Sequence, residues 1–445
     1  MRTVKDDKAL AFRLSLIVAF ILFLLPFHAL LTTWIGSNTG QLDLIKIWKE
    51  ILITLITPPA FYLAWRTPAL KQWLLKSWLA KLIYAYILLH ALLAAWALHS
   101  HQVDGVSLIY ALIINLRFIG FFLICLVLAK KSQFLTKNWP KFVLIPAGLV
   151  VFFGLLQRLF LPYDFLKHFG YGPKTIPAYQ TVDANLDYRR VQSSLRGANP
   201  LGAYLILIIT TIFLTLRRQL FWRSLAVLAS VAVLFFSYSR SAWIGTVLSL
   251  GVLGGLLLGR RMAWRQVLPA VVSMVVVASV GLYFFGSKQS VQDTLLHTSS
   301  VSKSSQSSNA VRIKSIRNAA KDVWHNPLGR GPGTAGPASF RNVGHPVRIA
   351  ENYYLQIGQE VGVLGILIFL AINLLVAQEL WKQKAEPLAQ ILLASLVGIT
   401  FVNMLSHAWA DDTLSLLWWG LAGIAIAPGI LSGRKLKNGK LQTLP

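Results

Sequence analysis

A series of apolar runs recurs along this chain, and it constrains the fold more than any other feature of the sequence. Each run holds about 20 residues, enough for a helix to cross a hydrocarbon core of about 30 Å. Only 13% of the 445 residues are charged, whereas about 25% is usual in soluble domains. The sequence therefore predicts an all-α, polytopic membrane protein, with residues 1–445 forming a single integral membrane domain.

About twelve transmembrane helices are predicted from these runs. They cover residues 11–35, 44–65, 78–98, 106–129, 141–161, 199–216, 221–238, 241–259, 265–286, 353–377, 387–407 and 412–431. The even-numbered connections are rich in basic residues such as Lys130 and Lys131, whereas the connections 99–105 and 405–412 contain no Lys or Arg. Because Lys and Arg are retained on the cytoplasmic side of a membrane, both termini are predicted to be cytoplasmic.

Two outer loops break this charge pattern. Residues 162–198 carry several basic residues, and residues 287–350 carry nine Lys or Arg against two acids. Long loops cross a membrane regardless of their charge, so their basicity needs another reason and we expect function there. The net charge of +27 is therefore interpreted as topology plus a membrane-surface site, and not as nucleic-acid binding.

The large outer loop, residues 287–350, is predicted to carry a short helix over residues 309–325. Its apolar stripe would consist of Val311, Ile313, Ile316, Ala320, Val323 and Trp324. With basic residues on the rest of its surface, such a helix could lie at the membrane surface. Residues 325–333 then hold three glycines and two prolines. We expect a tight turn there, whose backbone N–H groups face a ligand.

Arginines at the outer ends of the predicted spans are candidates for binding an anion. Arg240 lies between two spans with almost no loop, which is a costly place for a charge. Arg196 stands at the outer start of the sixth span, and Arg312 lies on the predicted loop helix. Arg forms bidentate contacts with phosphate oxygens, so these three are favoured over Arg189 and Arg190. The alternative for each is a snorkelling or solvated surface charge.

Glu351 is the candidate general base, at the point where the large loop runs into the tenth predicted span. The alternative is a helix N-terminal acid, which the macrodipole favours by about 0.3–1 kcal/mol. Asn352 would orient the carboxylate or a sugar hydroxyl. His345 in the loop is a candidate for substrate binding and, like His407, an alternative base.

Other polar residues near the span ends are interpreted as structural. Glu360 is expected to be a packing contact within its span, and Asp411 and Asp412 are expected to cap the twelfth span. The single cysteine, Cys125, excludes an intrachain disulfide and a Cys-rich metal site, and no ligand spacing indicates another one. We therefore expect neither a metal nor a cofactor.

In their order along the chain, these motifs resemble the O-antigen ligase and polymerase superfamily, called Wzy_C or WaaL-like. The resemblance covers most of the chain in topology and roughly residues 185–375 in motif. Its elements here are Arg196-Gly-Ala-Asn199-Pro, Ser239-Arg240-Ser-Ala, Arg312 before Trp324-His-Asn-Pro-Leu-Gly-Arg-Gly-Pro-Gly333, Glu351-Asn-Tyr-Tyr-Leu355 and Glu360-Val-Gly362-Val-Leu-Gly365.

The resemblance implies a metal-independent, inverting glycosyltransferase on the outer face of the cytoplasmic (inner) membrane. Its donor would be a glycan on an undecaprenyl-diphosphate carrier. Its acceptor would be lipid A core in a ligase, or another carrier-linked glycan in a polymerase. Arg240, Arg196 and Arg312 match family arginines that are expected to hold the diphosphate. In ligases a His of a His-Asn-x-Tyr-Leu motif is proposed to activate the acceptor. Glu351 stands in its place here, which keeps a possible base and leaves a polymerase or another acceptor open.

Two other function classes compete with this interpretation. A lipid-linked oligosaccharide transporter suits twelve spans, but it would need charged residues in mid-span, whereas the polar residues recognised above concentrate outside. A binding or scaffold protein of the envelope does not explain Arg240 and Glu351 at span edges. An activated lipid-linked donor needs no nucleotide, which fits a sequence without a P-loop. The expected partners are therefore the glycan donor, a lipid or glycan acceptor, and the bilayer.

Overall fold

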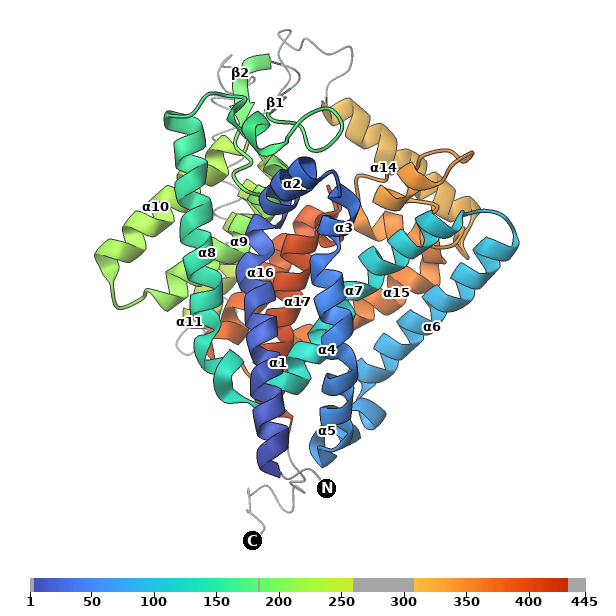
Figure 1. The fold of residues 1–445 in the computed structure, drawn as a ribbon, viewed down its shortest axis with the longest axis vertical. Helices are drawn as coiled ribbons and strands as arrows, with labels where there is room; N and C mark the ends of the chain where they lie inside the picture. The colour runs from blue at the N-terminus through green and yellow to red at the C-terminus, as the bar shows by residue number, and fades with distance from the viewer. Residues whose placement is uncertain (1–3, 183–184, 259–307, 431–445) are drawn as a thin grey trace.

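The computed structural model describes residues 4–182, 185–258 and 308–430, and these form a bundle of long helices (Figure 1). The N-terminal helices are α1 (Val4–Leu24), α2 (His28–Thr39), α3 (Leu42–Lys46), α4 (Trp48–Trp65), α5 (Pro68–Lys76), α6 (Trp78–His99), α7 (Gly105–Lys131) and α8 (Gln133–Leu159). The later ones are α9 (Ala198–Thr215), α10 (Leu220–Phe236), α11 (Arg240–Leu258), α14 (Ser308–His325), α15 (Tyr353–Lys382), α16 (Pro387–Asn403) and α17 (Asp412–Ile426).

Among the described residues, seven helical segments are long and apolar enough to cross a membrane, and α10 and α16 are shorter apolar helices. The seven are Lys5–Thr39, Trp78–His99, Gly105–Lys131, Gln133–Leu159, Ala198–Thr215, Arg240–Leu258 and Tyr353–Lys382. These helices agree with the predicted all-α, polytopic membrane protein. The count of twelve stays a prediction, and the predicted span 265–286 lies outside the described residues.

The first apolar segment is broken in two at Pro26. A 3-10 turn, Leu25–Phe27, separates α1 from α2 around Pro26. Proline supplies no N–H for the helical ladder, and the hydroxyl of Thr413 donates to the carbonyl of Leu25 at 3.1 Å. The break therefore ties this segment to the start of α17 and places His28 at the beginning of α2.

Glycines let the central helices approach closely. α17 lies in the middle of the bundle (Figure 1), and its residues from Thr413 to Ile426 are all buried. A Cβ at Gly423 would lie 2.3 Å from the carbonyl oxygen of Phe122 in α7, and one at Gly398 of α16 would lie 2.2 Å from that of Gly245 in α11. No side chain fits at such distances, so these two glycines set the spacing of the core helices.

The helix α15 is interrupted at Val361 and Gly362, and the glycine-rich turn of the large loop docks on the break. Gly362 adopts φ +73°, a conformation that glycine tolerates without strain. The amide of Gly331 donates to the carbonyl of Glu360 (2.8 Å), and the amide of Val363 donates to the carbonyl of Pro327 (2.8 Å). The turn thus replaces the hydrogen bonds that the broken helix cannot make.

The side chain of Glu360 completes this junction. Its carboxylate accepts from the amide of Gly333 (2.8 Å) and from the Asn115 side chain (2.7 Å) of α7. The expectation that Glu360 is a packing contact is confirmed. The expectation that the turn offers its N–H groups to a ligand is wrong for Gly331 and Gly333, because α15 already uses them.

Extramembrane structure gathers at one end of the bundle, where the sheet, α2, α3 and α14 lie (Figure 1). The strands β1 (Gln180–Val182) and β2 (Asn185–Arg190) pair antiparallel, within the predicted outer loop 162–198. In the large loop a 3-10 turn, Gly336–Arg341, follows α14. The part of that loop before α14, residues 287–307, lies outside the described residues.

The predicted helix over residues 309–325 is confirmed as α14, but its predicted apolar stripe is only partly correct. Trp324 is 84% exposed, and Ile313 is exposed as well. Val323 of the stripe is buried, as is Ala319 beside the stripe, and Val323 packs so closely on Gly358 of α15 that a Cβ there would lie 2.9 Å from it. α14 therefore turns its small and polar side toward α15, because the hydrogen bond from Gln359 of α15 to Asp322 fixes which face is buried.

Candidate active site

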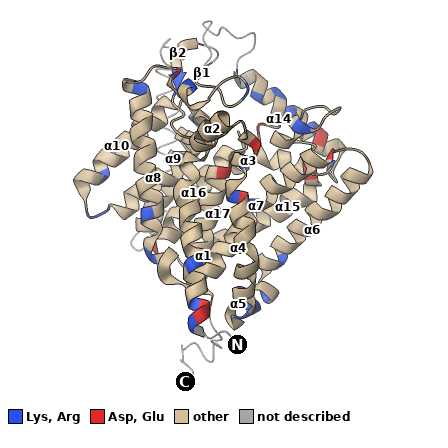
Figure 2. Cartoon of the chain, in the orientation of Figure 1, with Lys and Arg blue, Asp and Glu red and all other residues tan. Residues whose placement is uncertain are grey.

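A cavity of about 950 Å³ opens at this extramembrane end of the bundle. Its lining comes from α2, α3, α4, α7, the start of α9, the turn Gly336–Arg341 and the connection from α16 to α17. Among the residues predicted from the sequence, Arg196, Glu351 and His407 line it. Figure 2 places acidic and basic residues beside α3 and α7, within a bundle that otherwise carries few charges.

Glu351 lies just before the N-cap of α15, in a strained backbone conformation with φ +49°. Such a conformation costs a non-glycine residue of the order of 1–3 kcal/mol and is found mostly where function requires it. The carboxylate lies 3.9 Å from the guanidinium of Arg312 on α14, and both side chains are about one-third exposed. α14 and α15 thus bring together two residues that are 39 positions apart in the sequence.

His407 lies in the connection between α16 and α17 and lines the same cavity as Glu351. Burial lowers its pKa below the ordinary value of 6.5, although the negative charge of Glu351 acts in the opposite direction. The positive charges of Arg196 and Arg312 lower the pKa further. His407 is therefore neutral near pH 7 and stands as the second candidate base in the cavity.

Three basic side chains form a cationic rim on the cavity: Lys46, Arg196 and Arg341. Burial lowers the pKa of Lys46. The positive charges of Arg196 and Arg341 lower this pKa further, and the negative charge of Asp43 raises it. Asp43 lies 3.7 Å from Lys46 and 3.8 Å from Arg341, but its side chain is 83% exposed. One exposed carboxylate offsets little of the field of three cations, so the rim attracts anions.

Arg240 begins α11 and is not among the residues that line the cavity. Arg190 connects the turn that precedes Arg240 to the start of α9. Its Nε donates to the carbonyl of Ser237 (2.8 Å), and its Nη2 donates to the side chain of Asn199 (2.5 Å). Tyr238, in the same turn, has φ +50°. The structure therefore joins the Arg196 and Arg240 motifs, with Arg190 as the link between them.

The structure shows the surroundings of Asn352 and His345, and their roles toward a substrate stay predictions. The Asn352 side chain caps α15 by accepting from the amide of Leu355 (3.0 Å), and it donates to the carbonyl of Met404 (2.9 Å). Asn352 thus holds Glu351 next to the connection that carries His407. His345 is part of the loop after the turn Gly336–Arg341 and does not line the cavity.

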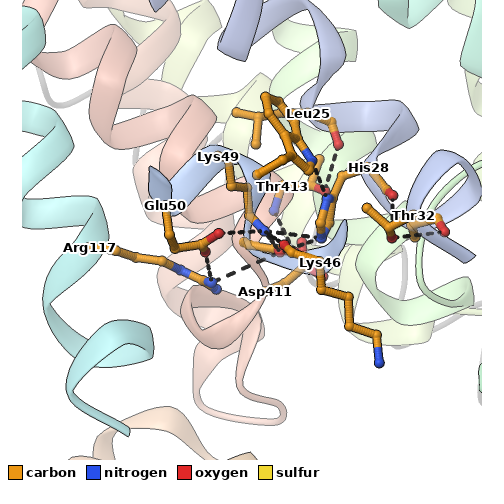
Figure 3. A network of polar contacts seen from close by, with 12 residues as sticks. Leu25, His28, Thr32, Lys46, Lys49, Glu50, Arg117, Asp411 and Thr413 are labelled. Carbon is orange, nitrogen blue, oxygen red and sulfur yellow. Dashed lines mark hydrogen bonds and ion pairs between the residues drawn. The ribbon is translucent and has the colours of Figure 1, made fainter. Parts of the chain in front are cut away.

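The most extensive polar feature of the cavity was not recognised in the sequence. It is a buried charge cluster, defined by His28, Lys49, Glu50, Arg117 and Asp412 (Figure 3). Lys49 Nζ lies 2.8 Å from Asp412 and 3.3 Å from Glu50. His28 Nε2 lies 3.0 Å from Asp412, and Arg117 donates to Glu50 at 2.9 Å.

A signal for this cluster was present in the sequence. Arg117 stands in the middle of the apolar run 106–129, and Lys49 and Glu50 lie within the run 44–65. Ionisable residues inside membrane spans are rare and mark functional positions by default. The view that polar residues concentrate outside the spans is therefore corrected.

Two further expectations can be compared with the same region. Asp411 caps α17 as expected, because its carboxylate accepts from the amide of Leu414 at 3.2 Å. Asp412 does more than cap, since it is paired with three basic groups in the buried charge cluster. Within the described residues, no group of three or more His, Cys, Asp or Glu side chains could hold a metal ion. Independence from metals stays a prediction.

α14 is anchored by Asp322, and this anchor determines where Arg312 lies. Arg330 donates to Asp322 through Nε (3.1 Å) and Nη2 (2.9 Å), and Gln359 of α15 donates to it at 3.0 Å. Burial tends to raise the pKa of Asp322, but these hydrogen bonds hold it below its usual range. Hydrogen bonds to a charged group contribute about 1.5–3 kcal/mol each, so Asp322 stabilises α14 on α15.

We expect Asp322→Asn to loosen α14 and to accelerate amide hydrogen exchange in residues 308–325. The neutral amide weakens the charge-assisted bonds from Arg330, so local opening becomes about ten-fold more frequent for a loss of about 1.4 kcal/mol. Mass spectrometry of exchanged peptides measures this effect. Asp187→Asn, on an exposed part of β2, is the control. Unchanged exchange in α14 would contradict the anchoring role.

The chain is similar to a known protein family. The family model described as O-antigen ligase matches residues 225–370. The matched segment contains Arg240, Arg312 and Glu351, and it includes α14 and the break in α15. No curated protein matches the chain.

Proposed function

We propose that this chain, which belongs to the O-antigen ligase and polymerase superfamily, is a glycosyltransferase that uses a glycan carried on undecaprenyl diphosphate. In the proposed reaction the glycan passes to lipid A core, and the alternative acceptor is another carrier-linked glycan, as in a polymerase. The observation that carries the proposal is the placement of Glu351 opposite Arg312, in a cavity with a cationic rim.

The cationic rim suits the diphosphate of the donor. A lipid diphosphate carries negative charge at the membrane surface, and this charge grows as the bond to the sugar breaks. Arg196, Lys46 and Arg341 would bind its oxygens, with Arg312 approaching from α14. Fixed cations in a partly buried site stabilise such developing charge more strongly than water does. Arg240 would contribute from the neighbouring start of α11.

Glu351 is the proposed general base of an inverting transfer. The acceptor hydroxyl attacks the anomeric carbon of the donor sugar, and a new glycosidic C–O bond forms. The C–O bond to the diphosphate breaks on the opposite face, and undecaprenyl diphosphate leaves with the bonding electron pair. The hydroxyl proton passes to Glu351 or, through it, to solvent. A carboxylate at this position performs the role that a histidine is proposed to perform in ligases.

The proposed location is the cytoplasmic (inner) membrane, with both termini in the cytoplasm and the site on the outer face. One observation supports this orientation. Lys130, Lys131 and Lys382 lie in the last turns of α7 and α15, which end away from the extramembrane structure. Basic residues favour the cytoplasmic side, so the cavity would face outward.

The proposal can be tested with the purified protein in detergent and an undecaprenyl-diphosphate-linked oligosaccharide, with and without a lipid A core acceptor. The readouts are the release of undecaprenyl diphosphate and the length of the glycan product. Release only with lipid A core indicates a ligase, and a lengthened carrier-linked glycan indicates a polymerase. Folded protein that releases nothing with either acceptor would contradict the proposal and favour a transporter.

We expect Arg196→Ala and Arg240→Ala each to weaken donor binding by about 10–150-fold. This range corresponds to the loss of one charge-assisted contact, about 1.5–3 kcal/mol. The affinity for the lipid-linked donor is measured directly in detergent. Arg223→Ala is the control, since Arg223 lies over the ring of Phe213 on another part of the bundle. Unchanged affinity in either variant would remove that arginine from the donor site.

A further inference from the structure

The buried charge cluster forms one wall of the cavity, and donor binding does not account for it. All five of its residues, His28, Lys49, Glu50, Arg117 and Asp412, line the cavity. They come from four different helices, α2, α4, α7 and α17. The cluster is continuous with the connection that carries His407, because Arg117 also donates to the carbonyl of Ala410 at 3.2 Å.

Stability alone is a poor reason for these charges. Lys49 is only 2% exposed, and its partners are largely buried. Removing ions from water costs free energy that their pairing only partly recovers, and well-packed apolar residues often stabilise a core equally well. Charges that are buried at such a cost while they face a cavity indicate a binding role.

The charge balance of the cluster distinguishes it from the cationic rim. Lys49 and Arg117 are balanced by Glu50 and Asp412, so the cluster has no excess of positive charge to attract an anion. The side chain of Lys46, which belongs to the rim, points away from the cluster in Figure 3. The cavity therefore has a cationic part and a part that offers alternating hydrogen-bond donors and acceptors.

Two atoms of the cluster keep hydrogen-bonding capacity. Arg117 Nε is buried and donates no hydrogen bond, and Glu50 Oε2 is buried and accepts none, although Lys49 lies 3.3 Å from it. A donor and an acceptor without hydrogen-bond partners, on two side chains that line the cavity, match a ligand group that both accepts and donates, as a hydroxyl does. Tyr110 and the apolar Ile109 and Ile113 of α7 line the same cavity and could contact a sugar ring.

We propose that the buried charge cluster binds the hydroxyl groups of an uncharged sugar, the acceptor sugar of the transfer reaction. Its role as acceptor rests on the proposed function. With the diphosphate at the cationic rim, a sugar at the cluster lies in the remaining part of the same cavity, which Glu351 and His407 also line. Glu50 and Asp412 accept from the sugar hydroxyls, and Arg117 donates to them.

The binding step is tested without catalysis, by saturation-transfer NMR on the full-length protein in detergent. The probes are the methyl glycosides of glucose, galactose and N-acetylglucosamine. We expect saturation transfer to at least one of these neutral glycosides. Glu50→Gln is expected to weaken this signal by about ten-fold. Arg223→Ala is expected to leave it unchanged, because Arg223 lies over the ring of Phe213 on another part of the bundle.

A structural role of the cluster is separated from recognition by deoxy sugars. Deoxy derivatives of the bound glycoside are compared in the wild type and in Glu50→Gln. Removal of one particular hydroxyl should lower the affinity of the glycoside for the wild type. The same removal should lower its affinity for Glu50→Gln by little, since the substitution and the deoxy sugar remove the same contact. If Glu50→Gln fails to fold, the deoxy series on the wild type still tests the proposal.

The outcomes are distinct for the two proposals. Absence of a signal from every neutral glycoside, or an equal signal in folded Glu50→Gln, overturns the sugar site. Binding that depends on Glu50, without any release of undecaprenyl diphosphate, supports the sugar site and contradicts the glycosyltransferase. Where transfer occurs, Glu50→Gln should raise the KM for acceptor by about ten-fold and leave the KM for donor unchanged.

Discussion

We expect Glu351→Gln to lower the rate of glycan transfer by about 100-fold or more and to leave donor binding unchanged. A glutamine amide keeps the shape of the carboxylate but cannot take a proton, and general bases contribute about 10²–10⁴-fold to a rate. The guanidinium of Arg312, 3.9 Å from the carboxylate, keeps its charge and a polar neighbour of the same shape, so the anion site should survive. Transfer is measured by the release of undecaprenyl diphosphate, and donor binding is measured separately.

Glu379→Gln is the matched control for this variant. Glu379 lies on the same helix, near its other end, in an exposed ion pair with Lys382. Full activity in Glu351→Gln would remove Glu351 as the base and shift that role to His407. In that case the rate would fall as the pH is lowered and His407 becomes protonated. This fall would lie below pH 6.5, because burial lowers the pKa of His407 from that ordinary value.

The second large effect concerns stability. We expect Glu360→Ala to lower the free energy of unfolding by about 2–6 kcal/mol. The change leaves the Asn115 side chain and the amide of Gly333 without their acceptor in a buried place, and each buried unsatisfied donor costs about 1–3 kcal/mol. The midpoint of thermal unfolding in detergent, followed by intrinsic fluorescence, should fall by several degrees.

Asn373→Ala serves as the comparison, on the same helix. The Asn373 side chain donates only to the carbonyl of Phe369, one turn earlier in α15, so its loss strands no group of another element. An unfolding midpoint of Glu360→Ala equal to that of the wild type would mean that the turn and the helix break do not depend on each other. Glu360→Gln should fall between the two, because one oxygen still accepts.

The class of the protein and the position of its loop helix could be predicted because they depend on local properties of the chain. The length of the apolar runs predicts spanning helices, and the pattern around residue 309 predicts α14 correctly. The buried face of α14 could not be predicted in the same way. Ile313 and Trp324 are exposed because Asp322 is bound by Arg330 and Gln359, and that contact exists only once α15 is in place.

The candidate site was predictable only in part. Glu351, Arg196 and Arg312 were recognised as separate motifs, and the cavity brings Glu351 and Arg196 into one lining, with Arg312 beside Glu351. Arg341 of the cationic rim gave no signal, because single basic residues in loops are common, whereas Lys46, near the start of the run 44–65, gave the same signal as Lys49. Arg117 did give one, as an arginine inside an apolar run, and its partners were not deducible.

By itself the sequence determined that this chain enters a membrane as helices and carries a polar site at one end, since hydrophobic length and charge act on each segment separately. The tertiary structure alone decided that the glycine-rich turn repairs a broken helix, that α14 places Arg312 opposite Glu351, and that four helices share one buried charge cluster. These features depend on hydrogen bonds and ion pairs between residues that are tens to hundreds of positions apart, such as His28 and Asp412. No local pattern specifies which distant partners will meet.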